Sequence, residues 1–171
     1  LIMLFSLLIT LIAFGGIAYY YLDSQLPDVE ALKSVQLPIP LRVYTSDGQL
    51  LSEFGELRRD PVKLNQIPPL LIKAILATED QRFYEHPGID VYGLVRAATE
   101  LVITGTKAQG GSTITMQVAR NFYLTRKKTF MRKLTEILLA LKIEREFTKD
   151  QILELYLNKI FLGNRAHGVA A

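Results

Sequence analysis

Apolar residues form one uninterrupted run at the start of the chain. Residues 1–22, LIMLFSLLITLIAFGGIAYYYL, carry no charged side chain. A helix of that length, at about 1.5 Å per residue, spans a hydrocarbon core of roughly 30 Å. The run is longer than the apolar part of a cleavable signal peptide, and the tyrosines near its end suit a membrane interface. We predict a transmembrane helix over residues 1–22, with a signal peptide or a buried core helix as the alternatives.

The pattern then becomes mixed and suggests a linker followed by a short β element. Residues 23–40 contain Pro27, Pro38 and Pro40 among polar side chains, which is typical of a linker. In LRVYTSDGQLLSEFGE, two alternating runs flank Asp47 and Gly48, and Asp-Gly between such runs predicts a β-hairpin.

From residue 68 onward, apolar positions recur at spacings of three and four, which is typical of helices. Pro68 and Pro69 suit a helix start, and the pattern continues to about residue 80. Thr148 with Gln151 three positions on matches a capping box. Further helices are predicted over residues 91–103, 113–122, 129–147 and 149–159. We therefore expect a mainly α domain over residues 41–171, with a small hairpin near its start.

Composition and charge indicate on which side of a membrane the rest of the chain lies. The chain has 171 residues, no cysteine and a formal net charge of +3, so its length suggests one domain besides the first segment and no disulfide holds the fold together. The flank DSQLPDVEALK holds three acids before its first lysine. Because cytoplasmic flanks are enriched in Lys and Arg, this side is expected to lie outside the inner membrane.

Two adjacent acids, Glu79 and Asp80, fall where the helix that follows Pro69 should end. Unpaired carbonyls at a helix carboxyl end disfavour an ionised carboxylate, which is unhelpful for stability but useful for a general base. The alternatives are that both acids are solvated, or that they bond to Arg82 or to backbone amides. His86, which precedes a Pro-Gly pair, is expected to be a packed turn residue rather than a ligand.

A glycine-rich stretch with nearby cations predicts an anion site. In GTKAQGGSTITMQVARN, residues 105–121, glycines lead into a Ser-Thr helix start, whose amides suit an anion or simply an ordinary cap. Gly111 stands where a Walker loop needs lysine, which argues against a nucleotide triphosphatase. Residues 101–135 contain seven cations and no acid. Nucleic acid is disfavoured outside the inner membrane, which leaves lipid head groups or a phosphorylated substrate.

One acid follows this basic stretch. Glu136 lies four residues after Arg132 and three after Lys133, so the three share a helix face. The alternative to a functional cluster is a surface ion pair worth under about 1 kcal/mol.

Taken together, four stretches resemble the glycosyltransferase domain of class A penicillin-binding proteins, the peptidoglycan glycosyltransferase family. They are EDQRFYEHPG, GGSTITMQVARN, RKLTEILLA and KDQILELYLNKIFLG, in the order that the family shows. The first segment and QLPDV further resemble the 1A type. Met116 departs from the family's glutamine and His167 from its tyrosine. The family's domain also continues past residue 171, so part of a lobe is expected to be missing.

The resemblance implies a lysozyme-like, two-lobed helical domain that polymerises lipid II with inversion and releases undecaprenyl pyrophosphate. It implies Glu79 as general base, with Glu136 near the pyrophosphate, where it orients cations or helps hold a divalent ion (Mg²⁺ or Mn²⁺). Asp80 is expected to brace the loop. Substrate contacts are carried over to Asp80, Phe83, His86, Lys107, Gly111, Ser112, Thr113, Gln117, Arg120, Asn121, Arg132, Lys133, Tyr156 and Asn158.

The resemblance also implies partners and a location. The expected partners are lipid II, the growing glycan strand, inner-membrane lipids, a phosphoglycolipid inhibitor of the moenomycin type and other cell-wall synthesis proteins. The domain is expected on the periplasmic face of a bacterial inner membrane, as a single-pass protein. Two rival functions are a lysozyme-like glycoside hydrolase and a membrane-anchored scaffold that binds anionic lipids without turnover.

Overall fold

The computed structural model describes residues 5–6, 9–10, 16, 21–35, 40–54, 60–105, 111–125, 127 and 129–171. The predicted transmembrane helix over residues 1–22 falls mostly outside this set. Within the described part of the chain, no helix is both long and apolar enough to span a bilayer.

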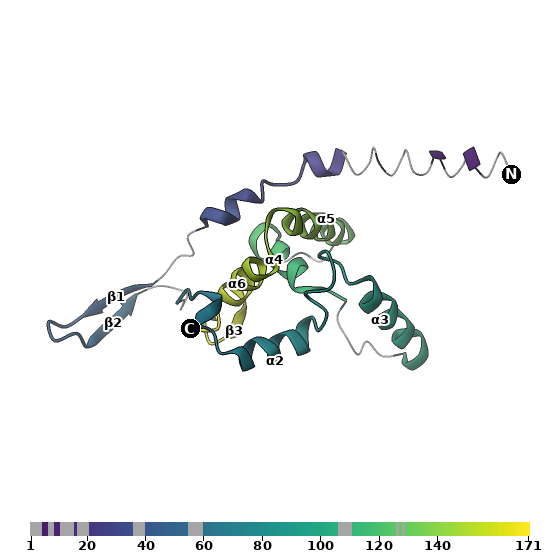
Figure 1. The fold of residues 1–171 in the computed structure, drawn as a ribbon. Coiled ribbons are helices and arrows are strands. Elements are labelled where there is room, and N and C mark those ends of the chain that lie inside the picture. The colour runs from purple at the N-terminus through teal and green to yellow at the C-terminus, as the bar shows by residue number, and fades with distance from the viewer. Residues whose placement is uncertain are drawn as a thin grey trace.

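The protein is mainly helical, as predicted (Figure 1). The helices are η1 (Glu30–Ser34), η2 (Leu64–Gln66), α2 (Pro69–Glu79), α3 (Val91–Thr104), α4 (Ile114–Tyr123), α5 (Phe130–Glu146) and α6 (Lys149–Lys159). The strands are β1 (Leu41–Tyr44), β2 (Leu50–Phe54), β3 (Phe161–Gly163) and β4 (Ala166–His167). The predicted two-lobed, lysozyme-like arrangement stays a prediction.

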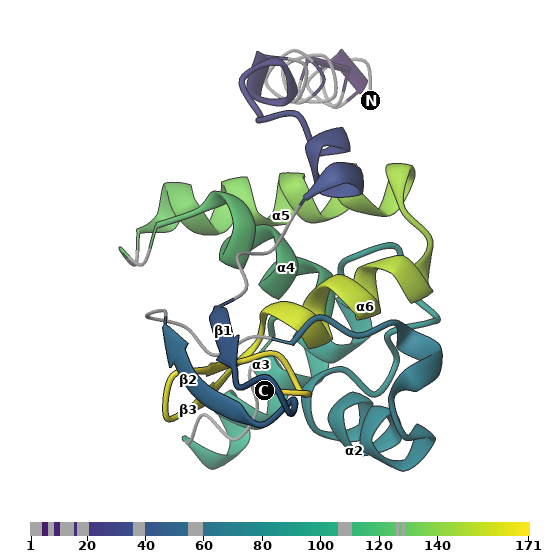
Figure 2. The ribbon, with the colours of Figure 1, turned by 90° about the vertical axis from the view of Figure 1, so that its left-hand side faces the viewer.

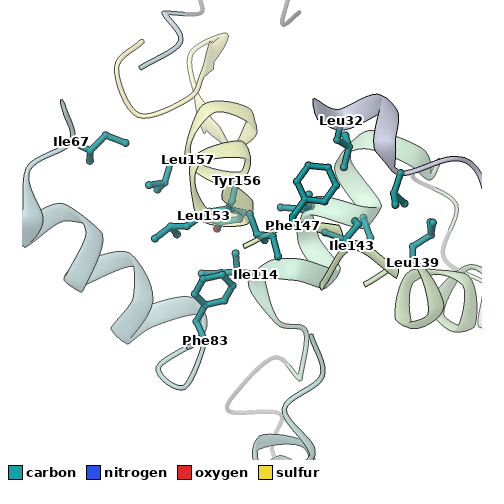
Figure 3. Packing of buried hydrophobic residues seen from close by; sticks show 14 residues of the cluster. Leu32, Ile67, Phe83, Ile114, Leu139, Ile143, Phe147, Leu153, Tyr156 and Leu157 are labelled. Atoms are coloured by element: carbon teal, nitrogen blue, oxygen red, sulfur yellow. The ribbon is translucent and has the colours of Figure 1, made fainter. Parts of the chain in front are cut away.

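Helix α4 is central and packs against both α5 and α6. In two views at right angles, α5 lies above α4, while α6 and then α2 lie below it (Figures 1 and 2). Ile114 and Val118 of α4 meet Ile143 of α5 and Leu153 of α6 in one hydrophobic cluster (Figure 3). Burying these aliphatic side chains is the main stabilising contribution to the arrangement.

Threonine caps begin three of the helices. The Thr113 hydroxyl accepts from the amide of Met116, Thr129 from Arg132 and Thr148 from Gln151. Gln151 returns the bond to the amide of Thr148, so the predicted capping box is confirmed. These local bonds satisfy amides that have no partner inside the helix, which explains why the sequence located the helix starts within a residue.

The stretch predicted as a linker is partly docked on the helical body. Val29 and Leu32 are buried in the same hydrophobic cluster as side chains of α5 and α6. Figure 3 shows Leu32 on the side of this cluster formed by Phe147 and Ile143. The Tyr123 hydroxyl donates to the Asp28 carbonyl at 3.1 Å, and Lys142 Nζ donates to the Pro27 carbonyl at 3.4 Å. Residues 26–34 thus form a docked segment, a name kept below.

The predicted β-hairpin is confirmed and projects from the body (Figure 1). Strands β1 and β2 pair antiparallel, with Leu41 opposite Phe54 and Val43 opposite Ser52. Gly48 takes a φ of +84°, a conformation that glycine adopts without strain. The predicted Asp-Gly turn therefore forms for the reason the sequence suggested.

Candidate active site

Helix α2 ends at Glu79, where the sequence predicted its end. The Glu79 side chain is exposed, whereas Asp80 is buried. Asp80 Oδ2 accepts from the amide of Ile114 at 3.0 Å, and His86 Nε2 lies 2.9 Å from Asp80 Oδ1. Adjacent acids thus have different environments. Asp80 fastens the turn to α4, in agreement with its expected bracing role, and Glu79 is left facing solvent.

Glu79 opens onto a cleft between the end of α2, the 80–90 turn, α3 and the start of α4. The cleft is small, with an internal volume of about 80 Å³, and it opens to solvent. It is lined by Ala77, Thr78, Glu79, Asp80, Gln81, Arg82, Asp90, Gly93, Leu94, Arg96, Ala97, Gly111, Ser112 and Thr113. Polar and charged side chains dominate this lining, so the cleft suits a hydrophilic ligand.

A glutamine on α4 holds the Glu79 carboxylate. Gln117 Nε2 donates to Glu79 Oε2 at 2.8 Å, while Glu79 Oε1 has no bond among the described residues. Burial raises the pKa of the Tyr156 hydroxyl on α6; the charge of Glu79 raises this pKa further, and that of Arg120 lowers it. One carboxylate oxygen of Glu79 is therefore fixed, and the other is available to a ligand.

The second predicted acid is the centre of a buried charge cluster. Glu136 is 0 % exposed; its Oε2 accepts from Arg132 Nη1 at 2.5 Å and its Oε1 from Lys133 Nζ at 2.7 Å. Lys133 Nζ also donates to Ser112 Oγ at 2.7 Å. Because Ser112 lines the cleft, it connects the Glu136 cluster to the cavity that contains Glu79. The surface ion pair considered from the sequence is wrong, since Glu136 has no exposed surface.

The amino end of α4 is already occupied by an anion from the chain itself. Its first amide, that of Ile114, donates to Asp80, and the amide of Met116 donates to the Thr113 hydroxyl at 3.2 Å. Thr113 also donates to the Gly88 carbonyl at 2.6 Å. Asp80 and Thr113 thus accept from two amides of this helix start, while Ser112 Oγ accepts from Lys133; the binding of an external phosphate here stays a prediction.

Several residues expected at the substrate lie elsewhere. Phe83 and Tyr156 are 1 % and 0 % exposed and belong to the hydrophobic core (Figure 3). His86 is buried against Asp80. Asn158 bonds both the amide and the carbonyl of Val62, at 2.9 and 2.8 Å, away from the cleft. These four support the site instead of lining it, because each is a core or anchoring side chain.

The remaining expected residues vary in position. Gly111 lines the cleft, and Arg120 lies half-buried on α4 near Tyr156. Asn121 is exposed on α4 and does not line the cleft. Lys107 lies outside the described residues. Sequence reasoning missed Arg82, Asp90 and Arg96 as cleft residues. Arg82 stands inside the acidic motif, but the approach of α3 that brings in Arg96 has no local signal.

Comparison with known proteins decides the family. A family model described as "Transglycosylase" matches residues 47–171. This chain belongs to the transglycosylase family. The match confirms the resemblance that the four motifs carried.

Relatives of this transglycosylase include penicillin-binding protein 1A of Pseudomonas aeruginosa, 58 % identical over 161 residues, covering 94 % of this chain and 20 % of that protein. Penicillin-binding protein 1A of Escherichia coli is 56 % identical over 153 residues, which cover 90 % of this chain and 18 % of that protein. That of Vibrio cholerae is 52 % identical over 153 residues, with the same coverage, 90 % and 18 %. The chain thus spans about a fifth of the length of the relatives it matches.

Two departures from the motifs have structural consequences in this transglycosylase. Met116, in place of a glutamine, is 1 % exposed, so its side chain contributes to the interior. Its neighbour Gln117 makes the polar contact to Glu79. His167 packs its ring against Phe161, with 4.9 Å between ring centroids, in the β3–β4 hairpin. Neither Met116 nor His167 lines the cleft.

Proposed function

We propose that this chain is the glycosyltransferase unit of a membrane-anchored peptidoglycan synthase. It joins lipid II units into glycan strands with inversion at the anomeric carbon and releases undecaprenyl pyrophosphate. One observation supports this above the others: an exposed carboxylate, Glu79, shares a cleft with Ser112, which is bonded to Lys133, one of two cations that surround the buried Glu136. Proton removal and phosphate stabilisation are thereby available on two walls of one cavity.

In this proposal Glu79 acts as the general base. Its Oε1 takes the proton from the 4-hydroxyl of the acceptor sugar as that oxygen attacks the donor's anomeric carbon. Gln117 holds the other oxygen, so the carboxylate enters the reaction oriented. Base catalysis of this kind contributes about 10² to 10⁴ in rate.

The bond that breaks joins the anomeric carbon to a pyrophosphate oxygen, which leaves with the electron pair. Lys133 and Arg132 stabilise the developing negative charge, and Ser112, which accepts from Lys133, keeps its own proton to donate. Glu136 does not touch substrate in this scheme; it is a positioning residue that keeps both cations near the cleft wall.

A divalent cation does not fit at Glu136. Both of its carboxylate oxygens are bonded to cationic side chains, and burial separates it from the cavity. Among the described residues there is also no group of three or more His, Asp or Glu side chains suited to a metal. Of the two roles that the resemblance left open for Glu136, orientation of cations is the one these contacts favour.

The decisive experiment incubates the full chain in detergent with lipid II and follows polymer length. Wild type is expected to make glycan strands, and Glu79→Gln to polymerise lipid II about 10²- to 10⁴-fold more slowly while keeping its helical circular-dichroism spectrum and melting temperature. Glu85→Gln is the matched control, since Glu85 is an exposed acid of the same turn paired with Arg82 at 2.9 Å. It should retain activity.

The same assay separates the rival functions. Cleavage of finished glycan without chain growth would identify a hydrolase. Binding to anionic vesicles that persists after Glu79 and Glu136 are both neutralised, with no turnover of lipid II by wild type, would identify a scaffold. Polymerisation by Glu79→Gln at the wild-type rate would remove Glu79 from the role of base.

A further inference from the structure

The 80–90 turn, which directly follows Glu79, owes its position to contacts with distant segments. Within it, Asp80 is bonded to the first amide of α4, and Phe83 is buried in the core. Tyr84 donates its hydroxyl to Asp150 of α6 at 3.0 Å. The turn is therefore placed by α4 and α6, and so is the carboxylate that precedes it.

Lys149, the first residue of α6, makes the closest of these contacts. Its Nζ donates to the His86 carbonyl at 2.6 Å and to Glu144 Oε1 at 2.7 Å, and it lies 4.4 Å from the centroid of the Phe83 ring. A cation in the first turn of a helix is disfavoured by the helix dipole. Helix stability therefore does not account for Lys149, whereas its three contacts to the turn and to α5 do.

Glu144 completes the arrangement from the last turns of α5. Its Oε1 accepts from Lys149 and also from the Thr115 hydroxyl of α4, at 2.5 Å. Its side chain is 9 % exposed and packs where Gly88 leaves room, since a Cβ at Gly88 would come within 2.9 Å of Glu144 Cγ. One carboxylate thus links α4, α5, α6 and the 80–90 turn.

From these contacts we propose that Lys149 and Glu144 are positioning residues that set the geometry of Glu79 through the 80–90 turn. The path is short: Lys149 bonds the His86 carbonyl, the His86 ring bonds Asp80, and Asp80 is covalently joined to Glu79. The inference rests on the proposed function of Glu79 as general base. It assigns a role in the reaction to two residues that do not line the cleft.

The test measures steady-state polymerisation of lipid II by the full chain carrying Lys149→Met. The substitution keeps an unbranched side chain over Phe83 and removes both hydrogen bonds. We expect kcat to fall by about 10- to 100-fold, because misplacing a catalytic group by about 1 Å can cost 10²-fold. KM should stay within about twofold, since Lys133 and Ser112, the proposed phosphate contacts, are bonded to each other, whereas Lys149 bonds His86 and Glu144.

Three further variants make the result specific. Lys149→Arg keeps a donor and should recover most of kcat. Glu144→Gln should lower kcat in the same direction. Lys159→Met is the matched control, because Lys159 lies on the same helix with its Nζ 4.7 Å from the Phe122 ring, far along α6 from the turn; it should leave kcat unchanged.

A double-substitution cycle distinguishes positioning from general loss of structure. If Lys149 acts through Glu79, Lys149→Met should reduce the residual rate of Glu79→Gln by less than about twofold. An equal loss in both backgrounds, an unchanged kcat in Lys149→Met, or failure of Lys149→Arg to recover activity would overturn the proposal. Absence of polymer from wild type would instead refute the proposed function itself, so the two failures are separable.

Discussion

Because the Glu136 carboxylate is buried, its replacement should strongly lower the free energy of unfolding. Removing one partner from a buried, hydrogen-bonded charge cluster costs about 3–5 kcal/mol, because the remaining charges stay desolvated. Arg132 and Lys133 are 18 % and 36 % exposed and can turn toward water, so we expect Glu136→Gln to lower the free energy of unfolding by about 3 kcal/mol, the lower end of that range. Urea denaturation measures the change.

Glu146→Gln provides the comparison on the same helix. Glu146 is 41 % exposed and pairs with Lys33 at 3.6 Å, so its loss should cost less than about 1 kcal/mol. Equal effects of the two substitutions would contradict the buried character of the Glu136 cluster.

Gln117 is the hydrogen-bond donor beside the Glu79 carboxylate, so a charge placed at position 117 should alter the protonation of the site. Gln117→Glu would place a second carboxylate within hydrogen-bond distance of Glu79 Oε2, and two carboxylates that close hold a proton between them. We expect the acid limb of the pH–rate profile for lipid II polymerisation to move upward by about one pH unit or more. Gln117→Met removes the donor but adds no charge, so it should lower kcat and move that limb by less than Gln117→Glu does; an unmoved limb in Gln117→Glu would show that the contact is not made in the working enzyme.

For single residues, the sequence predicted which side chains lie together better than it predicted which of them are buried. It predicted that Glu136 shares a face with Arg132 and Lys133, because that follows from helical spacing alone. It did not predict that Glu136 is buried, since its burial comes from packing between segments far apart in the chain. For the same reason Phe83 and Tyr156 were expected at the cleft, although their aromatic rings fill the core.

Among the elements, the 80–90 turn depends on a glycine in two ways. Gly88 has a φ of +92°, and a Cβ there would meet Glu144 Cγ at 2.9 Å and the Ala140 carbonyl oxygen at 3.1 Å. Gly48, with a φ of +84°, has open space. Gly48→Ala should therefore cost only the backbone term, about 1–2 kcal/mol.

Gly88→Ala should lower the free energy of unfolding by the same backbone cost and by about 1–3 kcal/mol more for overpacking. It should also lower kcat by displacing the turn. Thermal unfolding and the polymerisation assay check both parts. A cost for Gly88→Ala no larger than that for Gly48→Ala would show that α5 yields to the added methyl group.

Helix bounds were predicted closely because their causes are local. The capping threonines, the proline at the first position of α2 and the Asp-Gly turn each act within a few residues. The 80–90 turn was not predicted beyond a Pro-Gly break. Its shape comes from bonds to Ile114, Asp150 and Lys149, and no short-range pattern carries that information.

For the whole molecule, stability should fall in alkaline solution. Burial, aided by the hydrogen bond to Asp150, raises the pKa of Tyr84 to about 12, and burial also raises the pKa of Tyr123 and of Tyr156. An unfolded tyrosine loses its proton near pH 10. Above about pH 10 the native chain therefore binds more protons than the unfolded chain, so the free energy of unfolding decreases as pH rises through 12.

Urea unfolding between about pH 9 and pH 12 measures that slope. Tyr84→Phe should make it shallower, whereas Tyr44→Phe, which changes an exposed tyrosine on the hairpin, should not. A slope that is the same in Tyr84→Phe and wild type would remove Tyr84 from this account.

The mainly helical class and the hairpin were predictable from periodicity and turn chemistry, but the boundary of the domain was not. Prolines and polar residues in positions 23–40 indicated a linker, yet Val29 and Leu32 are core side chains. Two apolar residues in a polar stretch give no period, so only the fold, which places them in one hydrophobic cluster with residues of α4 and α5, reveals their role.

The docked segment joins the chain before residue 26 directly to the helices that carry the proposed catalytic groups. Pro27 and Asp28 are hydrogen-bonded to α5 and α4, and Val29 and Leu32 are core side chains. A rotation of the chain before residue 26 should therefore turn α4 and α5 as well. For a protein anchored ahead of this point, the height and tilt of Glu79 above the bilayer would then be a property of side-chain packing, and lengthening the polypeptide before residue 26 would change both.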